Sequence, residues 1–295
     1  MNIVKDSPIT QAIGGNSYTL HPLTHKDDND YSLSRKILLG FKYIVFVPII
    51  IIFILLFVTP IMLFGPRVVR HYLLSRMIPR VMAVLANKMK SQREKLLRNL
   101  EGKILDVGAG GGAYFVHYTK SKVETVVAIE PLIALHETLN KNALQSGLIS
   151  TNKNYCDDNI HSNSKKLRLE CCCVEEYITK YPEECGTFDW IIFGNVLCEV
   201  SNTCTTLQAV DHLLKPGGYI YFCEHVGQPK GSWSRLIQNI INPWWVRISG
   251  GCNCNRDTLD KFQKFPSWDE IIYWRYEKFL NPFILGLIRK APKCK

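Results

Sequence analysis

The residues with the clearest chemical potential lie in KILDVGAGGGAYF, residues 103–115, where a carboxylate precedes a run of glycines. Glycines that follow a strand let the backbone approach a ligand closely, and the N–H groups of the helix that comes next face the same ligand. The stretch therefore predicts a cofactor-binding turn, with candidate binding residues Asp106, Gly108, Ala109, Gly110 and Gly112.

Asp106 distinguishes between two classes of cofactor. At this position before the first glycine a dinucleotide site normally has an apolar residue, because a pyrophosphate gains nothing from a nearby carboxylate. A sulfonium cofactor has no phosphate and carries a cationic amino group, which a carboxylate can balance. Glu130 ends the next apolar run, where it can accept hydrogen bonds from ribose hydroxyls in both classes, or simply be a charge at a strand end.

A second candidate group follows the fifth apolar run, in the stretch FCEHV. His225 is a candidate for the acceptor-side base or thiolate partner, with Glu224 orienting it. Neighbouring residues of a strand face opposite sides, so one of the two can be structural, and a buried, hydrogen-bonded histidine is the alternative. Cys252 is a weaker candidate for a covalent relay.

From residue 103 onward, short apolar runs alternate with helical stretches, which is typical of a parallel α/β sheet. Five runs (KILDVG, TVVAIE, LRLECCCV, FDWIIFGNV and GGYIYFCEHV) are followed by two more near the end of the chain, EIIYWRYEKF and FILGLIRKAP, joined by Asn281-Pro282. Residues 145–166 are polar and aperiodic, and we expect a surface insertion there. The predicted catalytic domain covers residues 100–295.

The first hundred residues differ in character. Residues 1–42 are polar and are expected to form a disordered tail, and residues 43–66 form a hydrophobic anchor. No charge lies within this anchor, and a helix of this length, about 36 Å, would cross a bilayer. Pro48 and Pro60 would kink or break such a helix, so two forms are possible: a spanning helix, or a hairpin in one leaflet. Residues 67–99 alternate apolar and basic positions, which fits either a membrane-surface helix or the first helix of the domain.

The distribution of charge argues against a nucleic-acid binder. The formal charge is +10, but residues 65–98 alone hold nine Lys/Arg and one acidic residue, so the catalytic domain is nearly neutral. The basic excess follows the anchor, which predicts a cytosolic domain by the positive-inside rule. The eleven cysteines lack zinc-site spacing, and we expect no metal and reduced thiols.

These motifs occur in the order of the class I S-adenosylmethionine-dependent methyltransferases, which the chain resembles. The D-x-G-x-G-x-G turn, the acid at the second strand end, the Cys173–Glu176 stretch, the Asn195 loop and LLKPGGYIYF all match. The resemblance implies a Rossmann-like, seven-stranded α/β sheet with helices on both faces, S-adenosylmethionine as cofactor, and further cofactor contacts from Pro131, Val174, Glu175, Asn195 and Val196.

A narrower resemblance, to the membrane-associated thiol S-methyltransferases of the methyltransferase-like seven group, rests on NVLCEV, FCEHV, NPWW and GCNCNR. It implies methyl transfer to small lipophilic thiols at the endoplasmic reticulum or lipid droplet. Asn242 and Gly250 stand where that family tends to have acids, so the acceptor can differ. The alternatives are a lipid or quinone methyltransferase, a catalytically silent membrane or lipid-droplet scaffold and, more distantly, a nicotinamide dehydrogenase. The oligomeric state is left open.

Overall fold

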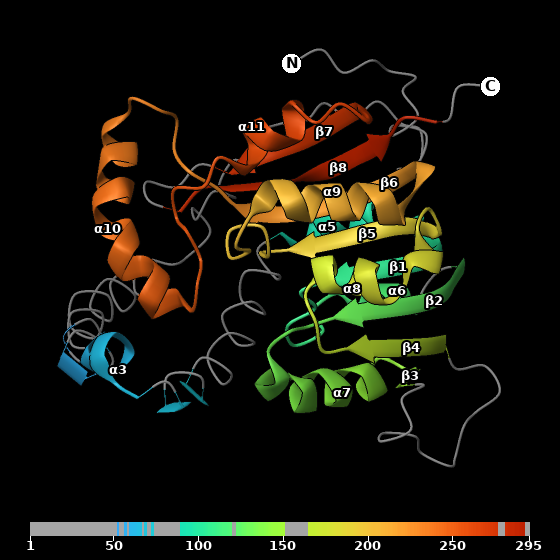
Figure 1. The fold of residues 1–295 in the computed structure, drawn as a ribbon, viewed down its shortest axis with the longest axis horizontal. Coiled ribbons are helices and arrows are strands. Elements are labelled where there is room, and N and C mark those ends of the chain that lie inside the picture. Colours follow the sequence, from blue (N-terminus) through green and yellow to red (C-terminus); the bar gives the residue numbers. More distant parts are fainter. Residues whose placement is uncertain are drawn as a thin grey trace, which may run out of the picture.

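The fold is described from a computed structural model of the chain (Figure 1). It describes residues 89–119, 122–150, 165–276 and 281–292, and before these residues 52, 56–57, 59–66, 68–69 and 72–73. The predicted tail at residues 1–42 and most of the predicted anchor lie outside the described residues. No helix within the described ranges is both long enough and apolar enough to cross a membrane.

The core of the molecule is one mixed sheet with the strand order β3-β4-β2-β1-β5-β6-β8-β7. All neighbouring strands from β3 to β6 are parallel, whereas β8 runs antiparallel to both β6 and β7. The strand bounds are β1 Glu101–Val107, β2 Lys122–Ile129, β3 Leu148–Ser150, β4 Lys165–Glu170, β5 Phe188–Gly194, β6 Leu214–His225, β7 Trp268–Tyr276 and β8 Phe283–Lys290.

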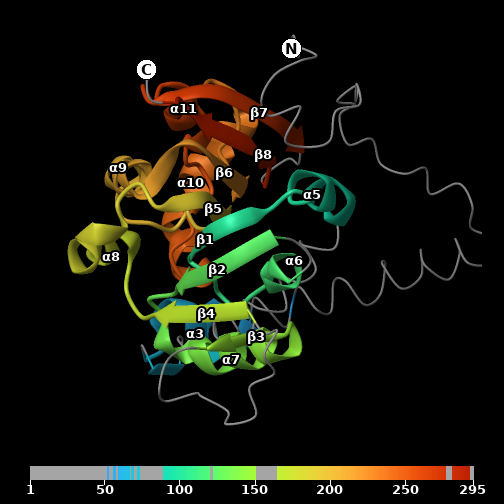
Figure 2. The same ribbon diagram turned by 90° about the vertical axis from the view of Figure 1, so that its right-hand side faces the viewer.

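Helices cover both faces of this sheet, as predicted (Figure 2). Apolar side chains alternate along the strands, so that Ile104 packs into one core layer and Leu105 into the other. The first layer lies under α5 (Lys90–Leu96), α6 (Phe115–Tyr118) and α7 (His136–Gln145); the second lies under α8 (Val174–Lys180), α9 (Thr203–Leu213) and α11 (Thr258–Gln263).

The structure corrects the sequence prediction at one edge of the sheet. Seven strands were expected, but Leu148–Ser150 form an eighth, short strand that pairs with β4. Gln145 ends α7, so the start of the predicted insertion belongs to the fold, and residues 151–164 lie outside the described residues. The run LRLECCCV is a strand only as far as Glu170, and its three cysteines follow in the turn before α8.

Two helices lie apart from these layers. The 17-residue α10 (Trp233–Ser249) lies beyond the carboxyl ends of the parallel strands, and α3 (Thr59–Phe64) packs against it (Figure 1). The polypeptide leaves β1 toward β2 and β4, then returns to β5 on the other side of β1. Such a switch point is where ligands bind in open α/β sheets.

Candidate functional site

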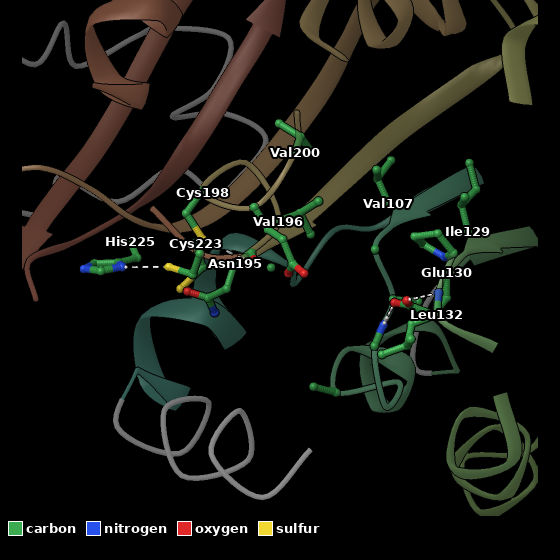
Figure 3. Close-up of a pocket in the computed structure, with 18 of the residues that line it drawn as sticks. Val107, Ile129, Glu130, Leu132, Asn195, Val196, Cys198, Val200, Cys223 and His225 are labelled. Atoms are coloured by element: carbon green, nitrogen blue, oxygen red, sulfur yellow. Dashed lines mark hydrogen bonds between the residues drawn. The ribbon is translucent and has the colours of Figure 1, made fainter. Parts of the chain in front are cut away.

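A cavity of about 570 Å³ lies at this switch point. Its lining comes mainly from the residues at or just after the carboxyl ends of β1, β2, β4, β5 and β6, together with α5 and α10. Figure 3 shows Glu130 and His225 at opposite ends of the cavity. The size is in the range of cavities that hold a cofactor and a small second substrate.

The glycine turn after β1 forms one wall of this cavity. Gly108, Ala109 and Gly110 line it, and both glycines have the positive φ that L side chains rarely adopt. A Cβ at Gly108 would lie 2.6 Å from Cγ2 of Val196, so only glycine allows the turn to meet the loop after β5. Gly112 does not line the cavity; its missing Cβ makes room for the ring of Phe115.

Glu130 joins the turn after β1 to the turn after β2. Its Oε2 accepts a hydrogen bond from the N–H of Gly110 and its Oε1 one from the N–H of Leu132, both at 2.8 Å (Figure 3). Burial raises the pKa of Glu130 above its ordinary value, although these two donors and His136 oppose the shift. Each oxygen keeps a second acceptor direction for a ligand hydroxyl, as a ribose-binding carboxylate requires.

Asp106 is placed differently from the prediction. It is buried at the end of β1 and accepts a hydrogen bond of 2.8 Å from the Tyr118 hydroxyl, and it does not line the cavity, whereas the next residue, Val107, does. The alternation of side chains along β1 explains this, because Val107 packs in the layer of α8 and Asp106 faces Tyr118 in the layer of α6. Burial raises the pKa of Asp106 to about 7. Any influence on a ligand amino group is therefore electrostatic.

This raised pKa predicts a dependence of stability on pH. Between the ordinary pKa of 3.8 and the folded value of about 7, the folded protein keeps a proton that the unfolded chain has lost. The contribution of Asp106 to the free energy of unfolding therefore falls as the pH rises through this window, by up to roughly 4 kcal/mol, and levels off above it. Asp106→Asn does not titrate and keeps an acceptor for Tyr118.

We expect cofactor-free Asp106→Asn to be more stable than wild type at about pH 8, with the difference shrinking toward about pH 4. Urea unfolding of both proteins across this range measures it, and the other buried carboxyls cancel because both proteins carry them. A difference that does not change with pH would contradict the assignment.

The other predicted cofactor contacts meet at the cavity. Pro131 follows Glu130, and Val174 and Glu175 begin α8, where Oε1 of Glu175 accepts a hydrogen bond of 2.5 Å from Thr206. Asn195 and Val196 line the opposite wall after β5. Asn195 has a φ of 63°, a left-handed conformation that is uncommon outside glycine and that turns the loop sharply.

Glu224 does not orient His225, contrary to the sequence prediction. It is fully buried, and its two oxygens accept hydrogen bonds from the N–H groups of Val196 at 3.0 Å and Leu197 at 3.1 Å. Burial raises the pKa of Glu224 to about 8, although both donors oppose the shift. Adjacent residues of β6 face opposite sides, so Glu224 holds the loop after β5, whereas His225 faces the cavity.

His225 contacts a cysteine instead. Its Nδ1 lies 3.3 Å from Sγ of Cys252, the contact drawn as a dashed line at His225 in Figure 3. The His225 ring also stacks on Phe283 and meets the edge of Trp245. Hydrogen bonds from Cys198, first, and from His225 lower the pKa of Cys252 to about 5, against the effect of burial. The Nε2 of His225 is buried and has no hydrogen-bond partner within the described residues.

Arg93, which α5 places in the cavity wall, was not among the predicted site residues. The side chain is buried, and its guanidinium lies 5.5 Å from the centre of the Tyr114 ring. Within the described ranges, no carboxylate lies in ion-pair distance of Arg93, and its Nε has no hydrogen-bond partner. A buried cation without a counter-charge is costly, so this arrangement is complementary to an anionic group on a ligand. In the sequence, Arg93 is one of several basic residues in the same segment, and no further pattern distinguishes it from the others.

Comparisons with known proteins agree with this geometry. A family model described as a methyltransferase domain matches residues 74–264. The thiol S-methyltransferase TMT1B of Rattus norvegicus is 26% identical over 263 residues, covering 82% of this chain and 98% of that protein. TMT1B of Homo sapiens is 26% identical over 72% of this chain and 84% of its own length. TMT1A of Homo sapiens is 26% identical over 63% of this chain and 71% of its own length. The family model spans more than half of the chain, including the glycine turn, Glu130 and His225. The chain therefore belongs to the methyltransferase-domain family and is an S-adenosylmethionine-dependent methyltransferase.

Proposed function

We propose that this protein transfers a methyl group to small lipophilic thiols while tethered to a membrane. One observation carries the acceptor assignment: His225 lines the cavity between the aromatic side chains of Trp245 and Phe283, and within the described residues its Nε2 has no hydrogen-bond partner. Such an aromatic end of the cavity excludes water and suits an apolar acceptor with one weakly acidic proton. The relatives named thiol S-methyltransferases support the same choice.

The proposed cofactor contacts place each part of S-adenosylmethionine against a different part of the cavity wall. Glu130 is proposed to bind the ribose hydroxyls, Val174 and Glu175 to contact the adenine, and Arg93 to bind the carboxylate of the methionine part. Asp106 is proposed to favour the cationic amino group through its charge alone. Bound S-adenosylmethionine would supply an electrophilic sulfonium methyl carbon, which the acceptor sulfur attacks in line as S-adenosylhomocysteine leaves.

His225 is proposed to be the proton acceptor for the thiol. In this proposal the thiolate form of Cys252, which its lowered pKa favours, accepts the Nδ1–H of His225, so that the tautomer is fixed and the free lone pair lies on Nε2. When the acceptor S–H transfers its proton to Nε2, its sulfur keeps both electrons and becomes the nucleophile. A thiol needs no stronger base, because a few per cent is already ionised near pH 7.

The membrane tether is proposed from the apolar segment at residues 43–66 and the basic segment that follows it. The family resemblance favours the endoplasmic reticulum or the lipid droplet, with the catalytic domain in the cytosol. Cell fractionation with protease protection of the catalytic domain tests both parts of this proposal.

The decisive test of the reaction uses detergent-solubilised protein and methyl-labelled S-adenosylmethionine. Aliphatic thiols, phenols, amines and quinols are offered as acceptors, and Glu130→Ala serves as the variant without cofactor binding. We expect label in the thiol products alone, and none with the variant. Transfer to a quinol or a lipid headgroup but to no thiol would overturn the thiol assignment and leave the methyltransferase in place.

A further inference from the structure

The outward face of α10 is apolar. Trp233, Leu236, Ile240 and Trp244 are 81%, 47%, 64% and 57% exposed. They are spaced three or four residues apart, so they form one stripe along the helix. We call these four residues the α10 stripe. A contiguous exposed apolar patch of this kind marks an interaction surface in a folded protein.

The inward face of the same helix is polar. Gln238 is fully buried, and its Oε1 accepts a hydrogen bond of 2.7 Å from the N–H of Gln228. Arg235 forms an ion pair of 2.8 Å with Asp257, and Oδ1 of Asn242 accepts a hydrogen bond of 2.9 Å from the N–H of Cys254. The apolar face of α10 is therefore exposed and its polar face is packed against the protein, whereas an ordinary surface helix buries its apolar face.

The surroundings of the stripe identify its partner as lipid. The chain has no acidic residue between Gln228 and Asp257, and exposed Lys230 and Arg247 flank the ends of α10. Tryptophans near both ends of the stripe match the preference of their rings for the membrane–water interface. Basic flanks with an apolar face are the pattern of a helix that lies on an anionic bilayer.

A second helix with exposed apolar residues lies beside α10. α3 packs against α10 (Figure 1), and its Ile61 and Phe64 are exposed. Residues 43–64, which lead into and include α3, contain no charge. The last part of the segment proposed above as the membrane anchor, α3, therefore lies beside the helix that carries the stripe.

We propose that the α10 stripe lies in the interfacial region of an anionic bilayer, as a second membrane contact beside the anchor. This inference builds on the membrane tether proposed above, but it concerns a helix of the catalytic domain. Trp245 and Ser249, on the same helix, line the cavity. Docking through the stripe therefore sets the acceptor end of the cavity against the bilayer, from which a lipophilic thiol enters without crossing water.

The test measures tryptophan quenching in the full-length protein, reconstituted in phosphatidylcholine–phosphatidylserine vesicles whose acyl chains carry bromine. Trp233→Phe and Trp244→Phe, singly and together, are compared with wild type. Trp268→Phe is the matched control, because Trp268 is buried in the core layer of α11. We expect the quenched component to fall in each stripe variant, to be lost in the double variant, and to be unchanged in the control.

Three results would overturn the inference, and they are distinguishable. Equal quenching in the stripe and control variants would show that α10 does not touch lipid. Cross-linking of two copies through α10 without quenching would assign the stripe to self-association. Failure of wild type to sediment with vesicles would remove the tether as well, whereas methylation of a water-soluble thiol in detergent tests the reaction separately. Cofactor binding by each variant confirms that it is folded.

Discussion

Replacing Arg93 by methionine is expected to remove most of the affinity for S-adenosylhomocysteine while leaving the affinity for methylthioadenosine almost unchanged. Both ligands carry adenine and ribose, but only the first has the amino-acid part. Losing one partner of a buried, hydrogen-bonded charge pair costs about 2–5 kcal/mol, or roughly 30- to several thousand-fold in Kd. Titration calorimetry of both ligands measures the difference, and it needs no acceptor.

Glu130→Gln is the matched comparison for this prediction. The carboxylate of Glu130 accepts hydrogen bonds from the N–H groups of Gly110 and Leu132, and the ribose that it is proposed to bind is present in both ligands. We therefore expect roughly 100-fold weaker binding of both, since hydrogen bonds to charged groups contribute about 1.5–3 kcal/mol each. If Arg93→Met weakened both ligands equally, Arg93 would support the shape of the cavity rather than bind a carboxylate.

Removing the imidazole of His225 is expected to slow methylation of aliphatic thiols and to leave acidic aromatic thiols nearly unaffected. A thiol with a pKa of about 8.5 is only a few per cent ionised near pH 7, so full ionisation by a base gains at most roughly 30-fold. A thiophenol is already largely ionised there. In His225→Ala, kcat/KM for the aliphatic thiol should fall by about this factor. The loss should vanish as the pH rises above the pKa of the thiol.

Cys252→Ala should reproduce part of this pattern, because it removes the sulfur that is proposed to accept the Nδ1–H of His225. Cys252→Ser restores a neutral acceptor and should recover part of the rate. Cys254→Ala is the control: Cys254 is buried two residues away and hydrogen-bonds to Gln238, outside the cavity lining. Equal losses for aliphatic and aromatic thiols in His225→Ala would show that His225 positions the acceptor instead of taking its proton.

Much of the cofactor end could be predicted because it depends on residues close in sequence. A strand, a glycine turn and an acid at the next strand end place Gly108, Gly110 and Glu130 together in any parallel sheet of this order. Along the strands, apolar residues either alternate with polar ones or form a continuous run, and continuous runs are typical of buried parallel strands. The short β3 carries too few residues for such a pattern, and it was missed.

The acceptor end could not be predicted in the same way. The contact of Cys252 with His225 joins residues 27 positions apart through the turn after α10, and no local pattern specifies it. Adjacent residues of β6 were both candidates, but only packing decides which one faces the cavity. Arg93 lies in a run of basic residues whose members look alike in sequence, and its burial distinguishes it.

The two hydrogen bonds to Glu130 are formed by the protein itself, so the turns after β1 and β2 are already joined before any ligand arrives. Glu130 and Arg93 are proposed to bind parts of the cofactor that remain after the methyl group has left. A preformed site of this kind holds the spent cofactor about as well as the fresh one. Turnover would then be limited by product inhibition, and the rate in a cell would follow the ratio of the two cofactor forms more closely than the amount of either.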